Sequence, residues 1–250
     1  MNSALLSVLR IAGLAVLLVA AWTVWERRVT LGSRIDSGAT VSTALFGVGA
    51  ALDSPWSQIA AASHPLTGEY YALTMVGHLC YITGAALGLR SIYRRLLSDD
   101  VFDHVMRKWL LPFVAGVVVI MVSSFSASAV TSTMPAVHLY LVHPDGWLTV
   151  YFLAHFGTMT LLGAICGYGI YRLRLDPRAV LLNLMLVALL VAAVCGGVGV
   201  GWGVITGRIE TLRLVAWLLT YAAFVAAGVG SVLQWRHRVQ ALVQPPRSQR

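Results

Sequence analysis

The sequence predicts an all-α protein, a polytopic bundle of about seven transmembrane helices, and three observations lead to this prediction. First, 58% of the 250 residues are hydrophobic, only 11% are charged, and the mean hydropathy is +0.77. A water-soluble domain carries charge on about a quarter of its residues, so lipid must cover most of this surface. Second, apolar runs of about 20 residues, the length that crosses the hydrocarbon core of a bilayer, recur along the chain. Third, the basic residues gather between these runs.

The apolar runs predict seven helices, at about residues 4–25, 35–52, 66–89, 109–130, 147–171, 179–205 and 212–235. The second run is the shortest and is rich in glycine and serine. The first run is interpreted as a retained helix, and a cleaved signal peptide is the alternative. Residues 1–243 therefore form one transmembrane domain. Residues 244–250 are polar and include two prolines, which predicts a disordered tail.

The distribution of basic residues predicts the orientation of these helices. If the N-terminus lies outside the cell, 15 of the 18 Lys and Arg residues fall on the cytoplasmic side. The two long outer segments, 53–65 and 131–146, contain none. Because cytoplasmic loops are enriched in Lys and Arg, we expect a multi-pass protein of the cell membrane with its C-terminus in the cytoplasm. Such clusters favour an anionic membrane surface over nucleic acid.

Glycines in the sixth run predict close helix packing. Within lipid, small residues spaced four apart let two helix backbones approach each other. The glycines with this spacing are Gly197, Gly199, Gly201, Gly203 and Gly207. A helix from a membrane-protein partner or from a second copy of the chain can pack on such a face. The alternative is a broken helix that lines a cavity.

Two histidines fall inside predicted spans. At about 1.5 Å of rise per residue, His78 lies roughly 18 Å and His155 roughly 12 Å from the outer ends of their helices. If both face one cavity, they can ligate haem iron or a transition metal. The alternative is that each forms hydrogen bonds to Ser, Thr or Tyr on neighbouring helices. His64, His138 and His143 offer a second, weaker metal hypothesis at the outer surface.

Other chemistry-bearing patterns are scarce. No carboxylate falls at the middle of a predicted span, and the nearest is Glu69 near the start of the third. Proton-coupled carriers usually hold a carboxylate at depth, so its absence argues against that class. No serine-hydrolase, zinc-protease or nucleotide-binding motif occurs, and we expect a protein that is not an enzyme.

Two stretches carry a family resemblance. The sequence PLTGEYYALTMVGHLCYITGAAL, with His78 at its centre, is the first, and WLTVYFLAHF through YRLRLDPRAVLLNLMLVALL is the second. Together they resemble actinobacterial seven-helix membrane proteins of uncharacterised function, which are often labelled transporters. In that family a basic residue precedes the histidine, where Gly77 stands here.

The sequence thus leaves three functional hypotheses. The first is a non-enzymatic accessory, sensor or partner-binding component that acts through helix packing. The second is a small-solute transporter or channel. The third is a haem- or metal-binding membrane protein that uses His78 and His155.

Overall fold

The computed structural model describes residues 3–32, 37–53, 64, 67–133 and 139–173, together with scattered positions between 191 and 236. The described residues are mostly helical and contain no strands, which confirms the all-α prediction. Three described helices are long and apolar enough to cross a membrane: Ala72–Tyr93, Asp99–Ala127 and Gly146–Leu173. The count of seven and the orientation remain predictions. The sixth and seventh predicted helices and the tail lie mostly or wholly outside the described residues.

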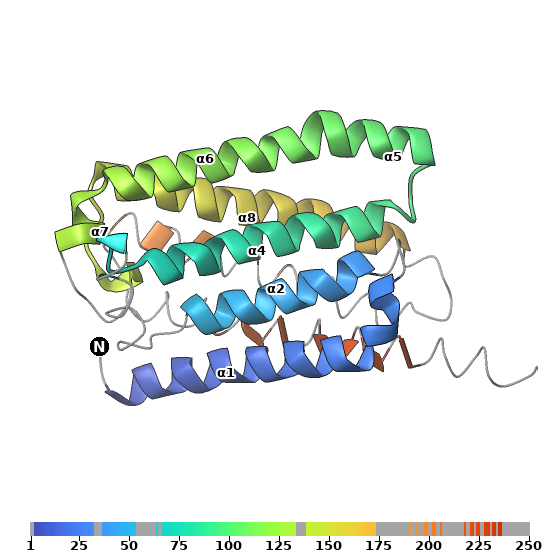
Figure 1. Cartoon of the computed structure of the whole chain (residues 1–250), viewed down its shortest axis with the longest axis horizontal. Helices are drawn as coiled ribbons and strands as arrows, with labels where there is room; N and C mark the ends of the chain where they lie inside the picture. Colours follow the sequence, from blue (N-terminus) through green and yellow to red (C-terminus); the bar gives the residue numbers. More distant parts are fainter. Residues whose placement is uncertain are drawn as a thin grey trace, which may run out of the picture.

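The long helices form a bundle in which consecutive members run in opposite directions (Figure 1). They are α1 (Ser3–Glu26), α2 (Ser37–Asp53), α4 (Ala72–Tyr93), α6 (Leu111–Ala127) and α8 (Gly146–Leu173). A short 3₁₀ turn, η1 (Arg28–Gly32), follows α1. Helix α2 packs between α1 and α4, and α8 contacts both α4 and α6. The bounds of α1, α2 and α8 agree with the expected ones to within two residues.

Helix α4 begins at Ala72, later than the expected start at 66. Gly68 has a φ of 74°, a left-handed conformation that glycine adopts without steric cost and that a helix does not contain. The Thr67 hydroxyl accepts a hydrogen bond from the Glu69 N–H at 3.2 Å, which further favours a turn. This later start brings His78 closer to the helix end than the sequence predicted.

The fourth predicted helix begins earlier than expected. Helix α5 (Asp99–Val105) continues through a π-helical turn, η2 (Met106–Leu110), into α6 without interruption. Pro112 lacks an N–H, and in a regular helix its ring would clash with the carbonyl group of Lys108. The widened π turn, closed by the Leu111 N–H bonded to the Met106 carbonyl group, accommodates this proline.

Between α6 and α8 the chain folds back towards the bundle. Ser128 is extended, and the short helix α7 (Ala129–Thr133) and the 3₁₀ turn η3 (Leu139–Leu141) follow. Asp145 then caps α8, since its carboxylate accepts the Leu148 N–H at 2.7 Å and the Ser128 hydroxyl at 2.8 Å. Leu139 and Tyr140 of η3 are buried, so this outer segment contributes to the core.

Small residues bring α2 and α4 into backbone contact. A Cβ atom on Gly77 would lie 3.0 Å from the Gly49 carbonyl oxygen, and the Ser42 hydroxyl donates to the Gly84 carbonyl group at 2.6 Å. This is the close approach that small-residue packing produces in membranes. It occurs here at α2 and α4. Of the glycines expected to pack in the sixth helix, Gly197, Gly201 and Gly207 lie outside the described residues. Gly199 and Gly203 are helical, and Gly203 is buried.

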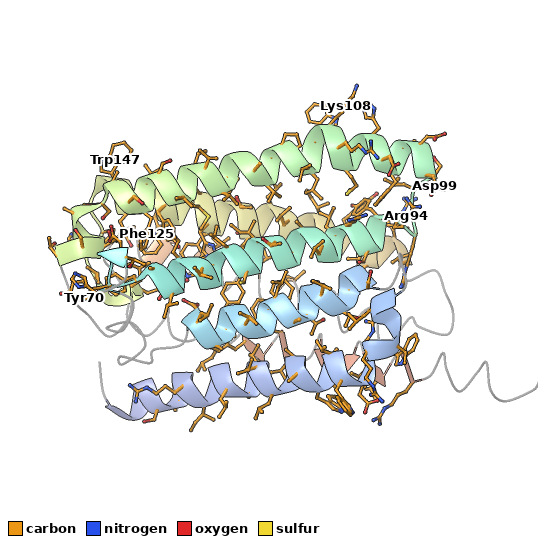
Figure 2. All side chains as sticks on the ribbon, in the orientation of Figure 1. Tyr70, Arg94, Asp99, Lys108, Phe125 and Trp147 are labelled. Carbon is orange, nitrogen blue, oxygen red and sulfur yellow. The ribbon has the colours of Figure 1, made fainter. Side chains whose placement is uncertain are left out.

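Because the helices alternate in direction, the basic residues gather at one end of the bundle, which is called the basic end below. Figure 2 shows Arg94, Asp99 and Lys108 at this end and Tyr70 and Trp147 at the opposite one. Every described basic residue except Arg10 belongs to the basic end: Arg27, Arg28, Arg90, Arg94, Arg95, Arg107, Lys108, Arg172 and Arg236.

Candidate functional site

A buried cluster of polar side chains lies towards the end of the bundle opposite the basic end, with His78 of α4 at its centre. The His78 side chain has no exposed surface. Its Nδ1 atom lies 2.7 Å from the Tyr151 hydroxyl of α8. Its Nε2 atom lies 2.6 Å from the Tyr140 hydroxyl of η3 and 3.1 Å from the Asp53 Oδ1 atom of α2. One imidazole thus joins four segments of the chain.

Asp53 reaches His78 because α2 is short. Its 17 residues span about 26 Å, whereas the 24 residues of α1 span about 36 Å. Figure 1 shows that α2 stops short of its neighbours at this end. Gly77 permits the contact, because a Cβ atom there would lie 3.2 Å from the Asp53 backbone nitrogen. Asp53 is only 2% exposed, although sequence reasoning placed it in an outer loop.

The segment around η3 closes the cluster. Leu139, Tyr140 and Val142 are all buried, and the Tyr140 ring packs against His78 with 5.4 Å between ring centroids. The same ring contacts Phe152 and Phe156 of α8 at 5.7 and 5.8 Å. We refer to residues 139–142 as the closing segment.

His155 extends the cluster along α8. It follows Tyr151 by four residues, a spacing that puts both side chains on one helix face. The His155 ring stacks on His78 with 4.0 Å between centroids and 14° between planes. It is 3% exposed, and its Nδ1 atom has no hydrogen-bond partner in the part of the chain that the structure describes. A buried polar atom without a partner costs about 1–3 kcal/mol of folding free energy.

The chemistry of the cluster centres on one proton that Asp53 and His78 share. The Nε2 atom carries at most one hydrogen, yet two oxygens lie within hydrogen-bond distance of it. Asp53 and His78 can share one proton either as carboxylate and imidazolium or as carboxylic acid and imidazole, and both forms have zero net charge. Gain of a second proton or loss of the first leaves a net charge on a pair that is buried away from water, which is costly.

Sequence reasoning singled out His78 and His155, and the structure brings them together. The geometry is that of the hydrogen-bonded alternative, with tyrosine and aspartate as partners of His78. Both His78 nitrogens are engaged, and nitrogens of two parallel stacked rings do not converge on one ion. The haem or metal hypothesis therefore gains no support from this arrangement. Among the described residues, no group of three His, Cys, Asp or Glu side chains is placed to hold a metal ion.

Two of the three outer histidines, His64 and His143, lie in the part of the chain that the structure describes. His64 stacks on Tyr70 with 4.0 Å between ring centroids, and His143 is exposed. His138 lies outside the described residues. The surface metal hypothesis thus stays a prediction.

Three residues of the cluster were missed from sequence: Asp53, Tyr140 and Tyr151. The spacing of Tyr151 and His155 was a usable signal, since it marks a polar face on an apolar helix. Asp53 and Tyr140 had no such signal, because their burial depends on how α2 and the closing segment fold. The chain matches no protein-family model, and comparisons with the curated proteins and with the solved structures found no match.

Proposed function

We propose that this chain is a multi-pass cell-membrane protein that senses protons through the Asp53–His78 pair and transmits the change by moving the closing segment. It works as a non-enzymatic sensor or accessory component. The observation that supports this proposal most directly is the burial of a carboxylate and an imidazole, 2% and 0% exposed, in direct contact within a membrane helix bundle. Ionisable groups at such positions are costly and are commonly retained for function.

The coupling follows from electrostatics. Because the pair is neutral with one proton, any change in its proton count creates a net charge that burial away from water disfavours. Tyr140 ties the closing segment to the same nitrogen that faces Asp53. When the pair takes up a second proton, we expect Asp53 to leave His78 and the closing segment to open, which admits water to the charge.

The orientation is part of this proposal. The gathering of described basic residues at one end supports an N-terminus outside and a C-terminus in the cytoplasm, across seven spans. The His78 cluster then lies near the outer surface. In this position it samples the pH of the outer solution.

Hydrogen exchange of the backbone tests the proposal. Full-length protein in nanodiscs is exchanged between pH 5 and pH 8, with rates corrected for intrinsic exchange. We expect residues 139–142 to lose protection at acidic pH in the wild type, and His78→Gln to abolish this pH dependence. His64→Gln, at the same end but outside the cluster, is the matched control and should behave as the wild type. Equal protection of the closing segment at both pH values would refute proton sensing.

Asp53 also favours a second candidate, a proton-coupled small-solute transporter. Such carriers hold a buried carboxylate within the helix bundle, and the sequence alone predicted none there. Proteoliposomes that contain a pH-sensitive dye test this candidate. A substrate-dependent proton influx that Asp53→Asn abolishes would favour transport, and its absence across a panel of small solutes would favour sensing.

A further inference from the structure

At the basic end, the end of α1 and the C-terminal segment form a cluster of arginine and tryptophan side chains. We call it the Arg–Trp cluster, and its members are Trp22, Trp25, Glu26, Arg27, Arg28, Trp235 and Arg236. It contains three guanidinium groups and one carboxylate, so its net charge is positive. It lies far along the bundle from the His78 cluster and plays no part in the proposed proton sensing.

The guanidinium groups of the cluster lie over its indole rings, and that of Arg28 lies at stacking distance. The Arg28 Cζ atom lies 4.3 Å from the Trp25 ring centroid, and its Nη1 atom donates to the Trp25 carbonyl group at 2.8 Å. The Arg27 and Arg236 guanidinium groups lie 6.0 and 5.8 Å from the rings of Trp235 and Trp22. Stacking holds a guanidinium by its face and leaves edge N–H groups for an anion.

Glu26 positions Arg236 without neutralising the cluster. Its carboxylate accepts hydrogen bonds from Arg236, from the Nη2 atom at 2.6 Å and from the Nε atom at 3.4 Å. These hydrogen bonds from Arg236 hold the pKa of Glu26 below its ordinary value. The Arg28 side chain remains exposed beside Trp25, which is 65% exposed.

We propose that the Arg–Trp cluster binds the headgroup of an anionic phospholipid, with Arg28 as the main phosphate contact and Trp25 as its support. Arginine presents N–H groups in a fork that matches phosphate oxygens. Tryptophan prefers the boundary between acyl chains and headgroups. An exposed arginine on an exposed tryptophan, at the end of an apolar helix, places both groups at the depth of the lipid phosphate. A soluble anion would use the guanidinium alone and would gain nothing from the indole rings.

Native mass spectrometry of the full-length protein tests this proposal. The protein is exchanged into phosphatidylcholine alone or into phosphatidylcholine mixed with phosphatidylglycerol, and retained lipids are counted. We expect selective retention of phosphatidylglycerol and a loss of affinity of about tenfold in Arg28→Gln, equivalent to about 1.4 kcal/mol. Arg10→Gln, near the opposite end of the same helix, is the matched control and should retain the lipid.

One further variant and one competition experiment complete the test. Trp25→Leu should also weaken phosphatidylglycerol retention, because the guanidinium loses its stacked support. Inorganic phosphate should not displace the lipid at equal concentration, and displacement would show a general anion site instead. The proposal is overturned if Arg28→Gln and Arg10→Gln retain phosphatidylglycerol equally in samples of equal thermal stability.

Discussion

The two tyrosines that contact His78 differ in one respect that stability measurements can resolve. Tyr151 is the partner of Nδ1, whereas Tyr140 shares Nε2 with Asp53. Replacement of either tyrosine by phenylalanine keeps the ring and its apolar contacts and removes one hydroxyl. Tyr151→Phe therefore leaves Nδ1 without its hydrogen-bond partner, while Tyr140→Phe leaves Nε2 with the carboxylate.

The magnitudes follow from this difference. Loss of a hydrogen bond whose remaining partner finds another costs about 0.5–1.5 kcal/mol, and a buried polar atom left alone costs about 1–3 kcal/mol. We expect Tyr140→Phe to fall in the lower range and Tyr151→Phe to fall in the upper one, with a gap of about 1 kcal/mol between them. The order holds for neutral and protonated His78 alike, because either form leaves Nδ1 unpaired.

Reversible unfolding in mixed micelles, with sodium dodecyl sulfate as the denaturant and circular dichroism as the signal, measures these free energies. Tyr168→Phe on α8, where the side chain is 57% exposed, is the matched control and should change stability by less than about 0.5 kcal/mol. A Tyr151→Phe variant as stable as Tyr140→Phe, or more stable, would refute the hydrogen-bond assignment of His78.

Three further predictions test the rest of the structure. Asp53→Ala breaks a buried pair and should cost about 3–5 kcal/mol in the same assay. His78→Phe added to it should increase this loss, because the buried hydroxyls of Tyr140 and Tyr151 then lose their contact with the imidazole. Glu26→Gln removes a carboxylate whose pKa is lowered by its arginine partner, so its stabilising effect is present above the ordinary pKa of 4.5 and is lost as pH falls through the lowered value. Melting temperatures of Glu26→Gln and wild type should therefore differ slightly at pH 7 and converge as the pH falls below the lowered pKa of Glu26. Gly49→Leu should prevent folding, since its Cβ atom would lie 2.7 Å from the Tyr81 ring, whereas Gly116→Ala, with open space around its Cβ position, should fold and melt like the wild type.

The helical architecture was predictable because hydropathy is a property of single stretches of sequence. The apolar runs located α1, α2 and α8 closely. The differences arose where one residue imposes a backbone conformation. Gly68 delays the start of α4, and Pro112 makes the helix before it a π turn. Hydropathy averages over such positions and does not register them.

The cluster was predictable only in part, because its contacts join residues far apart in the chain. The Asp53, Tyr140 and Tyr151 contacts of His78 span 25, 62 and 73 positions of sequence. A polar residue within an apolar run stands out, which is how His78 and His155 were identified. A charged residue at the end of such a run is interpreted as a loop residue instead. Asp53 was assigned that way, and only the shortness of α2 relative to its neighbours puts it inside the bundle.

Two of the acid–base contacts among the described residues differ in their physical consequences. Arg236 and Glu26 meet at 2.6 Å where both are partly exposed, and His78 and Asp53 meet at 3.1 Å where both are buried. An exposed pair contributes little to stability, because water already solvates both charges. A buried pair pays for its desolvation, and well-packed apolar residues of similar volume are often as stable or more so. A contribution to stability is therefore a poor reason for the presence of the Arg236–Glu26 pair and a still poorer one for the His78–Asp53 pair. We therefore propose that the first contact supports lipid binding and that the second is retained because the proton count of the pair is used.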